Sequence, residues 1–414
     1  VACSTYFLTQ AAMDYTYAGK PIPEASSHHL MDTWRMFRTI ILPWGETADP
    51  QGMDWELHGL PYINLYAALA TWKRDRFASH MEQVTLQYMR SWQVMCHGNL
   101  TLTGSPAGFG RHAINVEQAA YGFLAHKIFG PSVKPLAARE VNAQEESVWD
   151  YPYVDFIEHR TLQKFASFSW KNWIMGLLMP IEDHEGNPEF IVPITDGFVG
   201  SFELAHRGNV KPKVVEQSWE QKPDGFETKG ALLLDGGRLK QTLEMISVGS
   251  QTVVYEDRVT ALTNITVRSE HGVPIGIEND WLTGGTRLVS DEGGKIKFNW
   301  RKPQNPIDLP GSWANVGGRL GVVMMDGAGM AYAEAHGYSG LAVYTDILYG
   351  SYSNHPRRFK AGDEVSHRVG IFYVEVTPKQ TASLAKSCRI ETTPNGQVLH
   401  FKQPGGNDTQ VPLF

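Results

Sequence analysis

The sequence predicts an α+β protein in which an N-terminal helical domain, residues 1–165, is followed by a large antiparallel β-sandwich, residues 166–414. Three observations predict this division. Apolar residues recur every three or four positions before residue 165 and alternate with polar residues after it. Only 10 of the 40 glycines lie in residues 1–165. No helical segment of about ten or more residues connects the predicted strands, so parallel pairing is not expected.

The helical part contains amphipathic segments with a period near 3.6. In the clearest, residues 77–95, one apolar stripe runs the whole length and Asp75 stands where an N-cap is expected. Residues 31–42, 62–72 and 115–129 show the same period, and Gly130-Pro131 ends the last of these segments. Several helices without intervening strands predict a helical array or toroid.

The second part consists of short segments with a period of two, separated by glycine-rich turns. Such segments predict antiparallel sheets that stack as a sandwich. A small C-terminal β subdomain is expected from about residue 380. The predicted strands are residues 191–194, 252–259, 265–268, 319–325, 341–348 and 369–376.

Composition excludes several classes of protein. A net charge of −7 argues against a nucleic-acid partner, and no apolar run is long enough for a membrane-spanning helix. Three cysteines far apart in sequence predict neither a zinc ribbon nor a disulfide scaffold, and allow one disulfide at most. The chain begins with Val1 and shows no signal segment, so its location has to be inferred from its function.

Common catalytic signatures are missing. The sequence has no dinucleotide fingerprint, no P-loop, no HExxH and no GxSxG. The adjacent pair His28-His29 has no carboxylate at ligand spacing, so no metal site is predicted.

The most informative segment is residues 104–122. We expect a glycine- and proline-rich loop to present His112, and Tyr121 follows nine residues later, directly before Gly122. A histidine and a tyrosine can form an acid/base pair if a cationic neighbour lowers the phenol pKa from about 10. In the alternative interpretation, His112 caps a helix and Tyr121 belongs to the core.

This segment, Arg111-His112 to Tyr121-Gly-Phe-Leu-Ala, resembles the His…Tyr-Gly segment of the hyaluronate, chondroitin AC and xanthan lyases. Asp155-Phe-Ile-Glu-His159-Arg160 is similar to the Asp-x-x-x-His-Arg segment that leads into their sandwich, and residues 63–71 give a weaker match. The family combines an α/α toroid with a β-supersandwich. About 165 residues are fewer than its full toroid uses, so the resemblance implies a partial toroid or helices missing upstream.

The resemblance implies a polysaccharide lyase that cleaves a uronate-containing glycan by β-elimination without a cofactor, although relatives sometimes carry a structural cation. Tyr121 would act as base and then as acid. His112 would hold the substrate and help to keep Tyr121 ionisable, or share the role of base. Arg160 would bind the substrate or the developing phenolate, and Asn64 would neutralise the uronate carboxylate. Glu56 or His58 are alternatives for that last role. The further substrate-binding candidates are Trp55, Arg111, Asn115 and Trp170. The implied partner is an acidic polysaccharide, and the implied location is secreted or periplasmic.

Two other functions stay open at this point. A glycoside hydrolase needs two carboxylates, and no pair stands out in the sequence among Glu56, Glu117, Asp155 and Glu158. A non-catalytic glycan-binding module would use aromatic residues instead. In the sandwich, the basic segment 354–358 could face a polyanion or simply be solvated. The sequence does not predict the oligomeric state.

Overall fold

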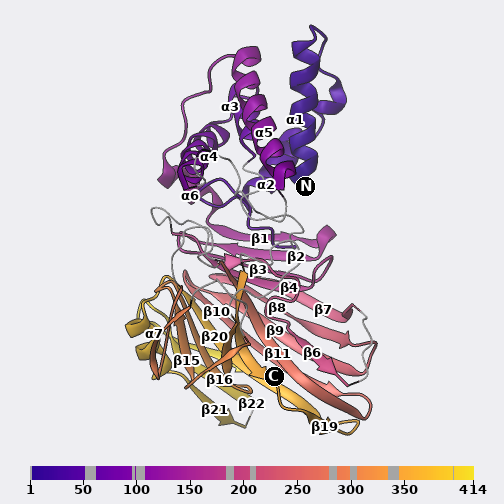
Figure 1. The fold of residues 1–414 in the computed structure, drawn as a ribbon, viewed down its shortest axis with the longest axis vertical. Coiled ribbons are helices and arrows are strands. Elements are labelled where there is room, and N and C mark those ends of the chain that lie inside the picture. Colours follow the sequence, from indigo (N-terminus) through magenta and orange to yellow (C-terminus); the bar gives the residue numbers. More distant parts are fainter. Residues whose placement is uncertain are drawn as a thin grey trace. The chain divides into compact units, whose positions relative to one another are not determined.

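The computed structural model describes residues 2–51, 62–95, 98, 108–182, 191–205, 211–278, 287–298, 305–333, 345–394 and 396–414. Two compact units divide the chain: the described residues up to Glu146, without Pro50 and Gln51, form the first, and the remaining described residues belong to the second (Figure 1). The change from helix to strand comes at Ser147, earlier than the expected boundary at 165/166. The fold class is mixed α and β, as predicted.

The first unit is helical. Its described helices are α1 (Ala2–Tyr17), α2 (Leu30–Arg38), α3 (Ile63–Thr71), α4 (Arg76–Met95), α5 (Gly108–Phe129) and α6 (Ala138–Glu145). Each of the four predicted helices is present. The predicted N-cap is confirmed, because the Asp75 carboxylate accepts a hydrogen bond from the Ala78 amide at 2.7 Å. Closure of these helices into a toroid stays a prediction.

One apolar cluster holds α2, α3 and α4 together. Trp34 of α2 is fully buried and its ring lies 5.8 Å from that of Phe77 and 6.0 Å from that of Tyr66. Arg38, at the end of α2, donates to Glu145 of α6 at 2.6 Å, which joins the two helix ends. The amphipathic stripes seen in the sequence are therefore the surfaces that meet in this core.

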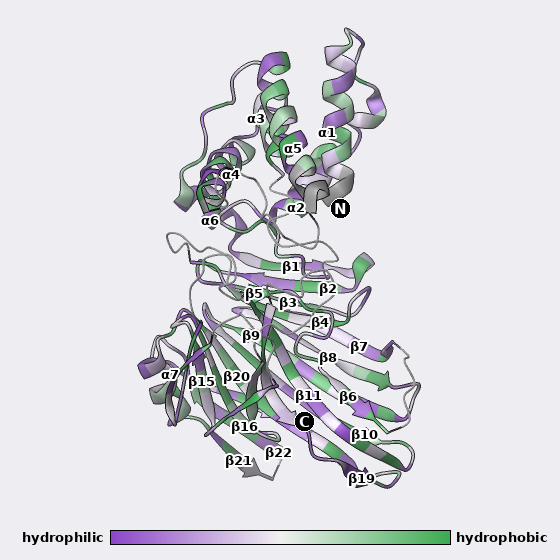
Figure 2. Ribbon diagram, viewed as in Figure 1, coloured by the Kyte–Doolittle hydropathy of each residue, from purple (hydrophilic) through white to green (hydrophobic). Residues whose placement is uncertain are grey.

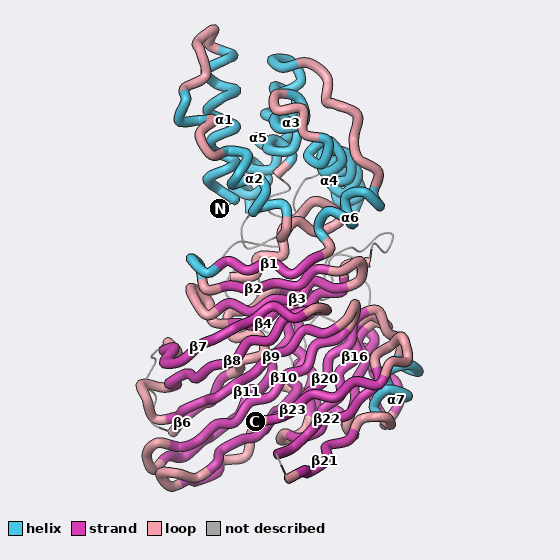
Figure 3. The backbone as a smooth tube through the Cα atoms, turned by 180° about the vertical axis from the view of Figure 1, so that it is seen from behind, coloured by secondary structure: helices cyan, strands magenta, loops and turns pink. Residues whose placement is uncertain are grey.

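The second unit is built from antiparallel sheets (Figure 3). Every strand pair in the described part of the chain is antiparallel. A four-stranded sheet consists of β1 (Ser147–Tyr151), β2 (Phe156–Arg160), β3 (Lys164–Ser169) and β4 (Met175–Pro180).

A nine-stranded sheet has the order β13-β12-β15-β16-β20-β10-β9-β8-β7. Its strands are β7 (Lys213–Lys222), β8 (Gly225–Leu234), β9 (Leu239–Val248), β10 (Thr252–Ala261), β12 (Arg287–Asp291), β13 (Gly294–Phe298), β15 (Trp313–Val316), β16 (Leu320–Asp326) and β20 (Glu364–Val374). Figure 2 shows both hydrophobic and hydrophilic residues along its long strands. Strands β10, β16 and β20 match predicted segments, whereas β7, β8 and β9 were not predicted.

A seven-stranded sheet lies against the nine-stranded one. Its main path is β14 (Ile307–Leu309), β17 (Met330–Ala333), β18 (Thr345–Ser353), β11 (Ile265–Glu278) and β19 (Arg357–Phe359), and β5 (Ile191–Val192) and β6 (Ser201–Leu204) also pair with β11. Near the C-terminus, α7 (Pro378–Ala385) precedes a separate three-stranded sheet of β21 (Arg389–Thr393), β22 (Gly396–Lys402) and β23 (Asp408–Leu413).

A buried ion network joins the two large sheets. Arg368 of β20 lies directly opposite Asp257 of β10 in the nine-stranded sheet, and its Nε donates to that carboxylate at 2.7 Å. Its Nη1 is 3.8 Å from Glu270 of β11, in the seven-stranded sheet. Burial alone would lower the pKa of Arg368, but the Asp257 carboxylate raises it, so the guanidinium stays charged. Both sheets are therefore held to one buried cation.

Removing one member of this network should destabilise the sandwich strongly, because it leaves an unpaired charge in the interior. We expect Asp257→Asn to lower the free energy of unfolding by about 3–5 kcal/mol, measured by urea unfolding. Arg389→Met, at an exposed arginine of β21, is the control and should change it by less than about 0.5 kcal/mol. Equal unfolding midpoints for the two variants would contradict this assignment.

His159 and Lys164 fix the four-stranded sheet on β9 and β10. The ring Nδ1 of His159 lies 2.9 Å from the Ser247 hydroxyl oxygen, and the Lys164 Nζ donates to the carbonyls of Gly249 at 2.8 Å and Thr252 at 2.9 Å. Burial, and secondarily the charge of Lys164, lowers the pKa of His159 to about 3. In the folded protein, His159 is therefore a neutral structural residue.

This buried histidine makes stability depend on pH. Between pH 6.5 and about 3 the unfolded chain protonates residue 159 and the folded chain does not, so the free energy of unfolding falls as the pH drops, by up to about 1.4 kcal/mol per pH unit. We expect His159→Gln to make the free energy of unfolding, measured with urea, fall less steeply as the pH drops. His355→Gln, at an exposed histidine, should not change this slope. Profiles of the same slope in the wild type and His159→Gln would rule this origin out.

Candidate functional site

Two side-chain hydrogen bonds form a polar seam between α1 and α5 of the helical unit, and Figure 1 shows these two helices. The Tyr121 hydroxyl donates to the Asp14 carboxylate at 3.1 Å, and one turn earlier on both helices the Gln10 amide donates to Glu117 at 3.2 Å. The second pair lies four residues before the first on both helices, so the two helices run in the same direction along this seam. Tyr121 is partly exposed, and its side chain packs against the buried apolar cluster of Met13, Ala67, Ala68 and Ala125.

The groups around the Tyr121 phenol are carboxylates. Desolvation, the hydrogen bond to Asp14 and the charges of Asp14 and Glu117 all raise the pKa of Tyr121. The cationic neighbour expected from the sequence is not found beside this phenol in the described residues. Tyr121 consequently stays protonated near neutral pH and is poorly suited to remove a proton.

Helices α3 and α5 lie in contact at Gly122. A Cβ placed on Gly122 would lie 3.5 Å from Cγ1 of Ile63, in ordinary van der Waals contact, so an alanine would fit there and a larger side chain would press on Ile63. Further along, Trp72 and Phe129 stack with ring centroids 5.8 Å apart. The glycine of the Tyr-Gly motif therefore lies in a contact between two helices, which favours a small residue at this position.

Two buried carboxamides lie on the facing sides of these helices. Asn64 precedes Ala67 and Ala68 by one turn on the α3 face that packs on α5, and Gln118 precedes Gly122 and Ala125 by one and two turns on α5.

Asn64 and Gln118 are both fully buried. Neither amide group makes a hydrogen bond within the part of the chain that the structure describes. Leaving such a group unpaired costs about 1–3 kcal/mol, so native proteins seldom bury one without a use for it. Asn115, predicted as a binding residue, is also buried, one turn before Gln118 on α5.

The prediction that a loop presents His112 is wrong. The backbone from Gly108 to Phe129 is one helix, so positions 112 and 121 are separated by two and a half turns, about 13 Å along the axis, and lie on opposite sides of α5. The structure therefore does not bring these two positions together on the helix. The side chains of Arg111 and His112 are not described, and their roles stay predictions.

Other predicted residues lie elsewhere. Arg160 is buried in β2 of the second unit, and its catalytic role stays a prediction. The interpretation of Trp170 as a groove residue is wrong: its ring is buried against Phe168, and its indole N–H donates to Thr228 at 2.8 Å. Trp55, Glu56 and His58 lie outside the described residues.

Sequence reasoning missed Asp14 and Gln118. Gln118 lies within residues 104–122, the segment singled out in the sequence. Its spacing of four and seven residues from Gly122 and Ala125 places it on the packed face of α5. Asp14 carries no comparable signal, because 107 residues separate it from Tyr121.

No protein-family model matches this chain, and no curated protein matches it. Among solved structures, it is similar to the heparan sulfate lyase HepC from Pedobacter heparinus, with 11% identity and a TM-score of 0.45, over 95% of this chain and 54% of that one. It is also similar to the GH36 α-galactosidase AgaB from Geobacillus stearothermophilus, with 9% identity and a TM-score of 0.34, over 57% of this chain and 42% of that one. The chain thus spans about half the length of either enzyme. None of its described helices meets the length and hydropathy that a membrane crossing requires.

Substitutions at Gly122 test its packing role. We expect Gly122→Ala to keep or raise the melting temperature, because alanine favours the helix by about 0.5–1 kcal/mol and its methyl group fits. Gly122→Leu should cost about 1–3 kcal/mol by forcing α3 and α5 apart. Ala120→Leu, on the exposed side of α5, is the control. Thermal unfolding followed by circular dichroism measures both, and a stable Gly122→Leu variant would contradict the close approach.

Proposed function

We propose that this protein acts on an acidic glycan and cleaves a uronate linkage by β-elimination, with the reaction centred on the helical unit. The observation that carries the proposal is the buried Asn64 side chain, whose amide atoms have no partner in the described residues. Asn64 is also the position that the resemblance to the polysaccharide lyases assigns to the uronate carboxylate.

The chemistry accounts for a buried carboxamide at this position. The C5 proton of a uronate becomes removable only when its carboxylate is neutralised, because the carbanion that forms delocalises into that group. Amide N–H groups aimed at the carboxylate stabilise this charge, and they do so best where water is excluded. Gln118, on the facing side of α5, offers a second such group.

Elimination also needs a proton acceptor at C5 and a proton donor for the departing glycosidic oxygen. The hydrogen-bonded pair of Tyr121 and Asp14 supplies one of each. The raised pKa of Tyr121 favours the phenol as donor. When the Asp14 carboxylate takes the C5 proton and the phenol protonates the leaving oxygen, proton transfer along their hydrogen bond restores both groups. The proton balance closes without a cofactor.

A second candidate is a glycoside hydrolase. The charges of both Asp14 and Glu117 act on the Tyr121 phenol, so the seam contains the two neighbouring carboxylates that hydrolysis requires. The two reactions leave different products. Elimination leaves a double bond conjugated to the carboxylate, which absorbs in the ultraviolet, whereas hydrolysis leaves only a new reducing end.

Asn64→Leu should separate activity from stability. We expect turnover of a uronic polysaccharide to fall about 10²–10³-fold, while the melting temperature stays the same or rises, because an unpaired buried amide is removed. The contrasting variant is Asn315→Leu in the sandwich. The Asn315 amide donates to the Val376 carbonyl at 2.7 Å and to the Thr381 hydroxyl at 2.9 Å, so its loss should lower stability. An active Asn64→Leu enzyme would remove Asn64 from the mechanism.

Three variants of the seam distinguish the two reactions. If the protein is a lyase, Tyr121→Phe and Asp14→Asn abolish the ultraviolet-absorbing product, and Glu117→Gln retains it. If it is a hydrolase, Asp14→Asn and Glu117→Gln both abolish the release of reducing ends, and no absorbing product forms at all. Assays of a panel of uronic and neutral polysaccharides with both readouts decide between them. Full activity of Tyr121→Phe would falsify the elimination scheme.

A further inference from the structure

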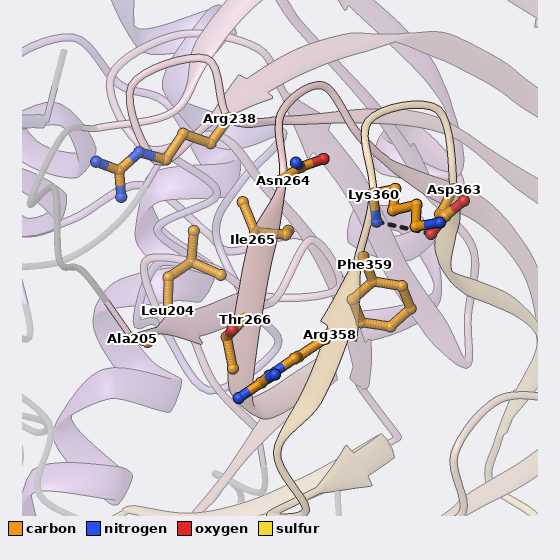
Figure 4. Close-up of a pocket in the computed structure, with 10 residues that line it drawn as sticks. All are labelled: Leu204, Ala205, Arg238, Asn264, Ile265, Thr266, Arg358, Phe359, Lys360 and Asp363. Atoms are coloured by element: carbon orange, nitrogen blue, oxygen red, sulfur yellow. Dashed lines mark hydrogen bonds between the residues drawn. The ribbon is translucent and has the colours of Figure 1, made fainter.

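The sandwich unit contains a pocket of about 670 Å³ that the proposed reaction does not use. It lies where β6 and β19 flank the beginning of β11, next to the turns that follow β8 and β19 (Figure 4). Its size is within the range of pockets that bind small ligands. All of the lining residues belong to the second unit, so the pocket is distinct from the seam of α1, α3 and α5.

Two cations on its wall, Arg358 and Lys360, are exposed and form no ion pair within the described part of the chain. The neighbouring Arg357 differs, because it is 2.7 Å from Glu270 and belongs to the buried network. A third cation on the wall, Arg238, has Asp235 at 3.4 Å. Against these three cations, the lining residues include one carboxylate, that of Asp363. In a chain with a net charge of −7, this local excess of positive charge favours an anionic ligand.

Hydrogen bonds hold the turn that carries Lys360. The Asp363 carboxylate accepts from the Lys360 amide at 2.7 Å, and the Asn264 side-chain oxygen accepts from the Ala361 amide at 3.1 Å. With its oxygen occupied, the Asn264 carboxamide presents its NH₂ group as a donor. The backbone beneath Lys360 is thereby fixed before any ligand binds, which reduces the entropy lost on binding.

The remaining wall is apolar. Leu204 and Ile265 project into the space, and the Phe359 ring borders it, as Figure 4 shows. Thr266 pairs with Arg358 across the β11–β19 ladder, which sets a hydroxyl group beside the guanidinium. A sugar carries both kinds of surface, since its ring C–H groups pack on apolar side chains and its hydroxyls form hydrogen bonds.

We infer that this pocket binds one charged sugar unit of an acidic glycan. Arg358 and Lys360 bind the carboxylate or sulfate group, and Phe359 and Ile265 contact the ring. Binding of an anion rests on the pocket alone, whereas the choice of a saccharide rests on the proposed function.

The test is isothermal titration of the full-length chain with hexagalacturonate, with neutral galactohexaose and with sodium sulfate. We expect Arg358→Gln/Lys360→Gln to weaken hexagalacturonate binding at this site about tenfold or more, because charge-assisted hydrogen bonds are lost. Lys295→Gln/Lys297→Gln, which removes the same charge from exposed positions of β13, should leave the affinity unchanged.

Several results would overturn the inference. The first is an equal affinity for hexagalacturonate in the Arg358/Lys360 and Lys295/Lys297 variants. The second is a wild-type affinity for galactohexaose equal to that for hexagalacturonate. The third is binding of sulfate without binding of hexagalacturonate. If the double variant does not fold, salt dependence of the wild type decides, because affinity that stays constant from about 50 to 300 mM salt excludes this contact. Asn64→Leu separates the two proposals, since it should lower turnover about 10²–10³-fold and leave this binding event intact.

Discussion

The buried guanidinium of Arg368 is the constraint on which the sandwich depends. A charge in the interior is tolerated only when it is paired and hydrogen-bonded, so Asp257 and Glu270 have to stay beside it. Because Glu270 belongs to the other large sheet, this requirement fixes how β10 and β20 meet β11. Glu270 also binds Arg357, which keeps β19 paired with the start of β11 and so shapes the pocket wall that carries Arg358.

In the helical unit, apolar packing surrounds buried polar groups. Gly122 lies where α3 meets α5, and Ala67, Ala68 and Ala125 belong to the apolar cluster beside it. One turn away, the amide groups of Asn64 and Gln118 have no partner within the described residues. Each costs the fold about as much as a good hydrogen bond would contribute. We regard that imbalance as the clearest sign of function in this chain, because stability alone would select against it.

The two proposed sites would divide the work on one polymer. In the helical unit, Tyr121 and Asp14 would transfer protons, and the amides of Asn64 and Gln118 would stabilise charge. The sandwich pocket offers two exposed cations and apolar contact. This division reconciles a net charge of −7 with an acidic glycan, since binding depends on the local field and not on the total charge. Because two carboxylates, Asp14 and Glu117, lie near Tyr121, hydrolysis stays the alternative to elimination.

The sequence by itself determined helices α2 to α5, the positions of strands β5, β10, β11, β16, β18 and β20, the Asp75 cap and the antiparallel class, because periodicity and capping are local properties. It did not predict helices α1, α6 and α7 or the start of the strands at Ser147. It singled out Tyr121 and Asn64, but not what surrounds them. Only the tertiary structure decided that Asp14 and not a cation meets Tyr121, that residue 112 lies in a helix, and that Trp170 is core. The physical reason is that a side chain's partner and its burial depend on packing between segments far apart in the chain, whereas the hydrophobic pattern reports only the face on which it lies.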